Sequence, residues 1–168
     1  MMNMTILPLI YGPNEIFSKR ALHIELVNNK IRSLVDDMLE TMYHENAIGM
    51  GANMVGILQR IVVIDLQHDD IRTPYSMINP EIIWHSNEVQ TFNEASICFT
   101  GISAKITRPK SIKVSYLDYN GIQQELEAEG YFATVIQHEI DYLNGKIFLD
   151  YLSKMKKDML LKKTSKKQ

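Results

Sequence analysis

The amino-acid sequence predicts an α+β domain in which antiparallel or mixed strands surround a central helix. Helical periodicity occurs near both ends of the chain, and short strand-like segments separated by turn residues fill its middle. The 168 residues are enough to bury one hydrophobic core, and 45% hydrophobic with 23% charged residues is typical of globular proteins. We therefore expect one domain over residues 1–168, ending in a frayed basic tail from about residue 160 to 168.

The first helix is predicted by apolar residues spaced three and four positions apart, which form one face of about four turns. These residues are Val27, Ile31, Leu34, Val35, Met38 and Met42. Asn28 or Asn29 can cap the start, because asparagine side chains accept hydrogen bonds from the free amides of a first turn. The segment "IGMGANMVG" that follows predicts a loop leading into a strand at "RIVVIDL".

Turn residues divide the middle of the chain into several predicted strands. The divisions fall at Asp69 with Asp70, at Asn79 with Pro80, and at Asn120 with Gly121. The last pair lies between "IKVSYLD" and "IQQELEAE", and an Asn-Gly pair in that setting is typical of a tight β-hairpin.

A second helix is predicted from about residue 131 to 144, because Gly145 is a typical helix terminator. His138 and Tyr142 lie one turn apart on one face, and Val135 beside them indicates that this face is buried. Another face carries an apolar stripe, formed by Phe132, Ile136, Ile140 and Leu143. A third amphipathic segment, "FLDYLSKMKKDMLL", predicts a C-terminal helix.

Composition excludes several classes of protein. The formal net charge of −2 gives no electrostatic basis for nucleic acid as the main partner. No stretch reaches the roughly 20 apolar residues of a membrane span, and the N-terminal segment lacks the pattern of a signal peptide. A single cysteine, Cys98, excludes an internal disulfide and suits a reducing compartment. We expect a soluble, cytoplasmic protein; no pattern predicts its oligomeric state.

The segment "VIQHEIDYLNG" contains the first half of the metal-hydrolase motif HExxH, with Tyr142 in place of the second histidine. Taken alone, the segment is weak evidence, because a histidine with a neighbouring tyrosine is more often a buried, hydrogen-bonded pair in a core helix. Its neighbours in the sequence distinguish the two. "IGMGANMVG", "NEASICF" and "IQHEIDYLNG" follow one another and resemble the three ordered motifs of the peptide deformylase family, GxGLAAxQ, EGCLS and QHExDHLxG.

This resemblance extends to "VDDMLETMY", "MINPEI" and "LDYLS" and so covers nearly the whole chain. It implies a compact α+β domain in which a cysteine and two histidines bind a ferrous or zinc ion. In that family the metal-bound water attacks the formyl group on the initiator methionine of a new bacterial or organellar protein. A glutamate shuttles the proton, and a glutamine stabilises the oxyanion.

The family's residues can be carried over one by one. Of three metal-ligand positions, His138 is retained, whereas Ser96 and Tyr142 replace a cysteine and a histidine. Glu139 stands at the general acid/base position, and Met54 replaces the oxyanion glutamine.

Further residues follow from the same resemblance. The amide of Ile97 remains as a backbone donor to the oxyanion, and Glu94 with Arg108 corresponds to a buried ion pair. The residues expected to line the substrate cleft are Ile48, Gly49, Gly51 and Ile136.

The replacements remove most of the expected metal chemistry. A serine hydroxyl stays protonated near neutral pH, and a tyrosine with a pKa near 10 ligates mainly hard, highly charged iron. Losing two ligands weakens metal binding by about four or more orders of magnitude. We therefore predict no bound cofactor, and a binding or regulatory pseudoenzyme that contacts N-terminal segments of nascent proteins.

Two alternatives stay open. The first is a divergent deformylase that uses one divalent metal, iron or zinc, with His138, Glu139 and a non-standard ligand such as Tyr142 or Cys98. In a strand, Cys98 would lie about 6 to 7 Å beyond Ser96, which a metal–sulfur bond of about 2.3 Å spans only with a bulge or a shifted strand. The second alternative is an interaction module whose cleft binds no ligand.

Overall fold

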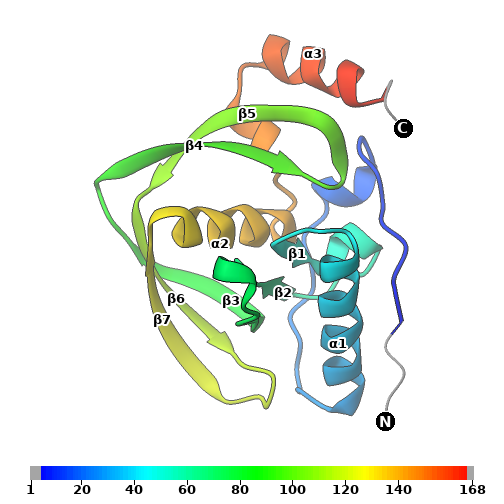
Figure 1. Cartoon of the computed structure of the whole chain (residues 1–168), viewed down its shortest axis with the longest axis vertical. Helices are drawn as coiled ribbons and strands as arrows, with labels where there is room; N and C mark the ends of the chain where they lie inside the picture. Colours follow the sequence, from blue (N-terminus) through cyan, green and yellow to red (C-terminus); the bar gives the residue numbers. More distant parts are fainter. Residues whose placement is uncertain (1–4, 166–168) are drawn as a thin grey trace.

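Two antiparallel sheets and three α-helices make up the described part of the chain, residues 5–165 of the computed structural model (Figure 1). The larger sheet has the strand order β1-β2-β3-β6-β7. Its strands are β1 (Gly49–Gly51), β2 (Ile61–Ile64), β3 (Tyr75–His85), β6 (Ser111–Leu117) and β7 (Gln123–Glu129). The smaller sheet is the hairpin of β4 (Val89–Ser96) and β5 (Phe99–Pro109). The α+β prediction is confirmed.

Helix α2 (Gly130–Leu143) lies between the β4–β5 hairpin and the larger sheet, and contacts strands of both (Figure 1). It follows β7 directly through Gly130, whose φ of 65° is a left-handed conformation that glycine adopts without strain. It ends before Gly145, which also has a left-handed φ of 74°. A Cβ on Gly145 would lie 2.8 Å from the carbonyl oxygen of Ser18, so this glycine also permits a close approach of two backbone segments.

The interior contains two hydrophobic clusters, and α2 contributes to both. Tyr142 belongs to the cluster under α1 and the hairpin, whereas Ile136 and Leu143 belong to the cluster on the larger sheet. Ten of the residues of α2 are buried, among them His138. The prediction that the face carrying His138 and Tyr142 is buried is confirmed.

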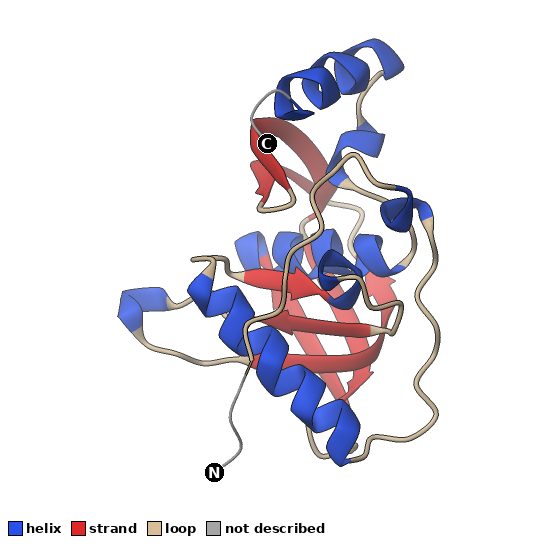
Figure 2. Cartoon of the chain, turned by 90° about the vertical axis from the view of Figure 1, so that its right-hand side faces the viewer, coloured by secondary structure: helices blue, strands red, loops and turns tan. Residues whose placement is uncertain are grey.

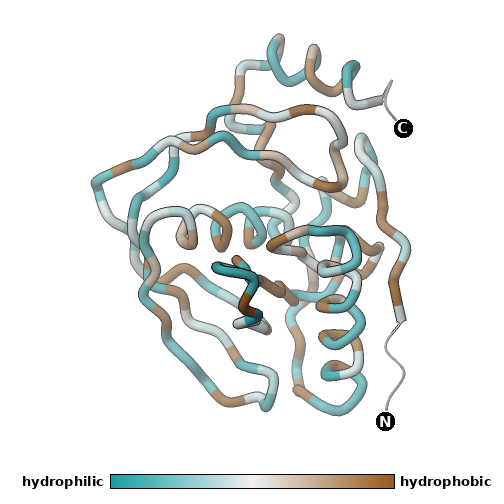
Figure 3. Tube along the Cα trace, viewed as in Figure 1, coloured by the Kyte–Doolittle hydropathy of each residue, from teal (hydrophilic) through white to brown (hydrophobic). Residues whose placement is uncertain are grey.

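Helix α1 (Asn29–His44) packs against β1 and β2, and is the long helix at the front of Figure 2. The side chain of Asn28 accepts a hydrogen bond of 3.0 Å from the amide of Ile31, so Asn28 is the N-cap, as predicted. Hydrophobic and hydrophilic residues alternate along its turns in Figure 3, as expected for a helix with one buried face.

Asn79 and Pro80 lie inside β3 rather than in a turn, so the turn predicted there is wrong. Asn79 has a φ of 51°, and the register between β3 and β6 shifts between Ile78 and Glu81. The pair therefore forms a β-bulge. By contrast, Asn120 and Gly121 do connect β6 to β7, as predicted.

The segment predicted as a glycine-rich loop is partly ordered as β1 and the 3-10 helix η2 (Ala52–Val55). Three further 3-10 helices occur in connections: η1 (Glu15–Ser18), η3 (His68–Asp70) and η4 (Phe148–Tyr151).

Helix α3 (Lys154–Ser165) packs against η4 and β5. Leu160 and Thr164 are buried, and the Thr164 hydroxyl donates a hydrogen bond of 2.8 Å to the carbonyl of Thr100. The predicted frayed tail is therefore wrong for residues 160–164, because they dock on the hairpin. Residues 166–168 of that tail and residues 1–4 of the N-terminal segment lie outside the described part. No described helix is long and apolar enough to cross a membrane.

Candidate functional site

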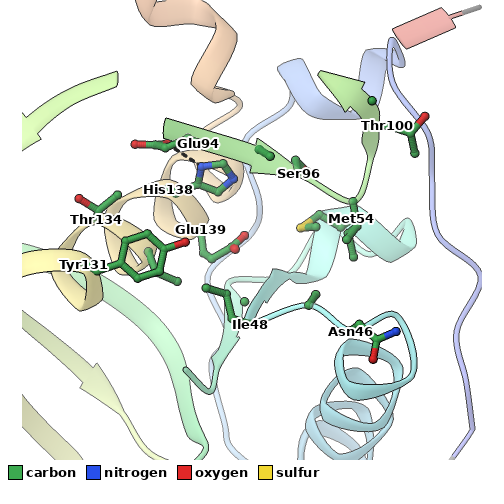
Figure 4. Close-up of a pocket in the computed structure, with 16 residues that line it drawn as sticks. Asn46, Ile48, Met54, Glu94, Ser96, Thr100, Tyr131, Thr134, His138 and Glu139 are labelled. Carbon is green, nitrogen blue, oxygen red and sulfur yellow. Dashed lines mark hydrogen bonds and ion pairs between the residues drawn. The ribbon is translucent and has the colours of Figure 1, made fainter. Parts of the chain in front are cut away.

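A pocket of about 410 Å³ opens between the β4–β5 hairpin, the start of β1 and one face of α2. Figure 4 shows its two walls, with Glu94 and Ser96 of β4 beside His138 and Glu139 of α2, and Ile48 and Met54 across from them. The lining residues are Asn46, Ala47, Ile48, Gly49, Met54, Glu94, Ala95, Ser96, Ile97, Thr100, Gly101, Tyr131, Thr134, Val135, His138 and Glu139. Segments from three distant parts of the chain thus build one site.

His138 is held in position by Glu94, because its Nδ1 lies 2.8 Å from Oε1 of that carboxylate. A carboxylate only accepts hydrogen bonds, so Nδ1 is the donor and Nε2 is left for another group. The imidazole also stacks on Phe148, with ring centroids 5.6 Å apart. The histidine is therefore fixed on two sides.

Glu94 in turn pairs with Arg108, as predicted, through two hydrogen bonds of 2.7 and 2.9 Å. Burial alone would raise the pKa of Glu94, but the hydrogen bonds from His138 and Arg108 outweigh burial and hold that pKa below its ordinary value. Arg108 also donates a hydrogen bond of 2.8 Å to the carboxylate of Asp141. Its charge is thus shared between two carboxylates, and neither is left unpaired.

Glu139 points into the pocket and, unlike Glu94, has no arginine or histidine of residues 5–165 bonded to its carboxylate. Its side chain is buried, and Oε1 has no hydrogen-bond partner among the described residues. Burial is the main reason that its pKa rises to about 7; the nearby Glu94 raises it further, while His138 and Arg108 act in the opposite direction. Gly49 makes room for the carboxylate, because a Cβ there would lie 2.6 Å from Glu139 Oε2.

Ser96 and Tyr142 bond to each other. Their hydroxyl oxygens are 2.6 Å apart, and Ser96 Oγ also accepts a hydrogen bond of 3.2 Å from the amide of Cys98. Tyr142 is fully buried, and burial raises the pKa of its phenol well above the ordinary value. Both groups therefore stay protonated near neutral pH, and each satisfies the other.

Met54 lies on the opposite wall and has no hydrogen to donate. Its Sδ instead accepts a hydrogen bond of 3.3 Å from the amide of Gly51. The neighbouring Asn53 donates a hydrogen bond of 2.6 Å to the carbonyl of Tyr142, which connects η2 to α2. The thioether is thus a fixed, apolar part of the pocket wall.

The structure brings together most of the residues predicted for the site, but not all. Two residues predicted to line the cleft do not: Gly51 is buried behind the wall, and Ile136 faces the other hydrophobic cluster. Tyr142 is also absent from the lining, although it bonds to Ser96, which is present.

On the sequence alone, Cys98 is expected in a strand with Ser96. In the structure Cys98 lies in the turn instead, because β4 ends at Ser96 and β5 begins at Phe99. It is fully buried in the hydrophobic cluster under the hairpin and does not line the pocket. Burial raises the pKa of its thiol strongly, which disfavours the thiolate that a metal would need.

Several lining residues were not predicted, among them Thr100, Tyr131 and Thr134. Thr100 enters the pocket because the hairpin turns at residues 97–98, and its buried Oγ1 has no hydrogen-bond partner among the described residues. Tyr131 and Thr134 lie in the first two turns of α2, on the face that also carries His138. That spacing is a usable signal for these two, whereas no sequence pattern singles out Thr100.

The polypeptide deformylase family model matches residues 6–158 of this chain. The chain belongs to the peptide deformylase family. A Rickettsia conorii protein named peptide deformylase-like is 58% identical over 158 residues, covering 94% of this chain and 86% of that relative. A second protein of the same organism, named peptide deformylase 1, is 43% identical and covers 97% of each chain.

Solved peptide deformylase structures confirm the fold. The enzyme from Ehrlichia chaffeensis in complex with actinonin has a TM-score of 0.94 at 39% identity, and the match covers 98% of this chain and 99% of that one. The deformylase from Legionella pneumophila has a TM-score of 0.90 at 33% identity, and the match covers 96% of this chain and 95% of that one. Peptide deformylases normally use a divalent metal ion, so the donor groups of this chain have to be compared with that requirement.

Proposed function

We propose that this chain binds the N-terminal segment of a peptide in the pocket between β4 and β1 and does not carry out metal-dependent deformylation. The observation that carries the proposal is the hydrogen bond of 2.6 Å between Ser96 and Tyr142. Two positions that supply metal ligands elsewhere in the peptide deformylase family here hold neutral hydroxyl groups, and these bond to each other.

The remaining donors do not fit a divalent metal ion. His138 offers one nitrogen, and the thiol of Cys98 is buried away from the pocket with its pKa raised. Among residues 5–165, no group of three or more His, Cys, Asp and Glu side chains is arranged to hold a metal. A structural or catalytic zinc site normally takes three or four such ligands, so a single histidine supports at most weak binding.

Peptide binding is supported by the backbone around the pocket. β1 is an edge strand of the larger sheet, β4 pairs only with β5, and residues of both line the pocket. An extended peptide can therefore add as a strand beside one of these edges and place its first residue against the apolar wall at Ile48 and Met54. A relative from Acinetobacter baumannii has been solved with Met-Ala-Ser bound, which makes a short peptide of that sequence a suitable probe.

A second candidate is metal-dependent hydrolysis of N-formylmethionyl peptides. It is favoured by the relatives' names, since proteins 42–45% identical to this chain are named peptide deformylases. It is also favoured by His138 and Glu139, which keep their places side by side in the pocket. The 58% identical relative, in contrast, carries the name peptide deformylase-like in an organism that also has a peptide deformylase 1.

The two candidates are distinguished by measurements on one preparation, purified without added metal and then tested again with iron and zinc added. The first proposal predicts less than about 0.1 metal ion per chain, no formate released from formyl-Met-Ala-Ser, and measurable binding of Met-Ala-Ser peptides. One metal ion per chain together with formate release would establish the second candidate. Absence of peptide binding would contradict the first.

A further inference from the structure

We propose that the pocket recognises a free α-ammonium group at the start of the peptide in preference to a formylated terminus. This inference rests on the proposed peptide-binding function and names the form of the terminus that the site takes. The chemical class of ligand is a peptide whose first residue is apolar and carries an unmodified amine.

The first argument is the unpartnered oxygen of Glu139. This residue is 4% exposed, it lines the pocket, and its Oε1 has no hydrogen-bond partner among the described residues. A buried carboxylate oxygen without a donor is costly, and a charged donor compensates it best. An α-ammonium group offers three N–H donors and a positive charge within the volume of one small group.

The second argument is the balance of charge around the pocket. The lining contains the acidic residues Glu94 and Glu139 but no lysine or arginine. Glu94 is already compensated by Arg108 and His138, whereas nothing of the kind bonds to Glu139. The ionised form of Glu139 therefore carries a negative charge that no lining group compensates, so it attracts a cation and repels an additional anion.

The third argument concerns the oxygen that a formyl group would bring. That oxygen needs hydrogen-bond donors, and the side chain at one expected donor position is Met54, which has none. The amide of Cys98 is used by Ser96, and the Ser96 hydroxyl by Tyr142. The amide of Ile97, on the pocket lining, is a backbone donor left beside Ser96.

Thr100 also has an unpartnered hydroxyl on the lining, but it lies at the opposite end of the pocket from His138, with Ser96 and Met54 between it and Glu139 (Figure 4). A formyl group placed beside Met54 thus lacks the side-chain donor that a glutamine would supply there. A free amine loses nothing by comparison, since it is only a donor.

The test compares three forms of one peptide, Met-Ala-Ser with a free, a formylated or an acetylated N-terminus, by calorimetry at pH 7. At this pH most of the free amine is protonated. We expect the free form to bind about tenfold or more tightly than the formylated form, the size expected for one hydrogen bond to a charged group. The acetylated form should bind no better than the formylated one.

Two variants assign the preference to its cause. Glu139→Gln should weaken binding of the free form about tenfold and change the formylated form by less than about threefold. Met54→Gln, which adds an amide donor to the wall, should strengthen binding of the formylated form instead. The matched control is Glu127→Gln, on exposed β7, which should change neither affinity. Near-ultraviolet circular dichroism confirms that each variant is folded.

The outcomes separate this inference from the proposed function. Equal or tighter binding of the formylated peptide overturns the inference and leaves peptide binding standing. A preference for the free amine that persists in Glu139→Gln also overturns the inference, because the carboxylate proposed to cause the preference is absent from that variant. Failure of all three peptides to bind overturns the inference and the proposed function together.

Discussion

The hydroxyl oxygen of Ser96 lies 2.6 Å from that of Tyr142, although the two residues are 46 positions apart in the sequence. One comes from the end of β4 and the other from the last turn of α2. The family resemblance predicts a cysteine and a histidine that bind one ion at these two positions, and the contact shows that the side chains at both positions converge. The scaffold that would bring two such ligands together is therefore present.

An intact scaffold predicts that metal binding can be restored. The double variant Ser96→Cys with Tyr142→His should bind one zinc or iron ion per chain, with affinity at least about four orders of magnitude above that of the unmodified protein. Metal content after dialysis and competition with a chromogenic chelator measure this. The two single variants are the controls and should show much weaker binding. If the double variant remains metal-free, the ligand positions do not converge as described.

The stability of the protein should depend on pH through Glu139. Its pKa is about 7 in the folded chain and about 4.5 in the unfolded chain, so between these values the folded state holds the extra proton. The stabilisation is fully present below about pH 4.5 and is lost as the pH rises to about 7. The difference of about 2.5 pKa units corresponds to about 3 kcal/mol in the free energy of unfolding.

Urea denaturation between pH 5 and 8 measures this dependence, with Glu139→Gln as the test variant. The amide cannot ionise, so the variant should lack this decrease and gain stability relative to the unmodified chain as pH increases. Glu127→Gln, on the exposed strand β7, should leave the original pH dependence in place. A variant Glu139→Gln with an unchanged pH profile would mean that another group is responsible.

Removing Arg108 should be costly, because it leaves two buried or partly buried carboxylates without their partner. Arg108→Met should lower the free energy of unfolding by about 3 to 5 kcal/mol, the range for breaking a buried ion pair from one side. The matched control is Lys113→Met, which removes an exposed pair with Glu127 and should cost less than about 1 kcal/mol. Similar losses in both variants would contradict the assignment of Arg108 as the buried anchor of Glu94.

Gly49 should resist substitution because of the carboxylate beside it. A Cβ at this position would lie 2.6 Å from Glu139 Oε2, so Gly49→Ala should cost about 1 to 3 kcal/mol by overpacking. In a Glu139→Ala background the clashing atoms are absent, and the same substitution should cost much less. A double-mutant cycle measured by urea denaturation gives the coupling energy, and a value near zero would argue against the steric explanation.

Helices α1 and α2 and the β6–β7 hairpin could be predicted because their signals are local. A three-four apolar period, an asparagine cap and the Asn120–Gly121 pair all act within a few residues. The bulge at Asn79 and Pro80 could not, because the same pair is typical of a turn, and only the pairing of β3 with β2 and β6 decides between the two.

Tertiary contacts also determine which residues meet in the site and which line the pocket, and local sequence patterns do not record these contacts. The meeting of Ser96 and Tyr142 depends on how the hairpin lies over α2, which no periodicity records, and it was expected only from the family resemblance. Thr100 enters the pocket because of where the hairpin turns, and Ile136 leaves it because α2 has two buried faces. Residues 160–164 dock through the burial of Leu160 and the hydrogen bond between Thr164 and Thr100, which sequence composition could not reveal.

The placement of α2 in both hydrophobic clusters has a consequence for how the protein unfolds. Loss of either cluster would expose one side of this helix, and the helix carries side chains that complete the other cluster; β2 likewise contributes to both. Neither half can therefore melt while the other keeps its packing, and the two sheets behave as one cooperative unit. Amide hydrogens in β2 and in the β4–β5 hairpin should accordingly exchange with solvent through the same global opening, although these strands share no hydrogen bonds.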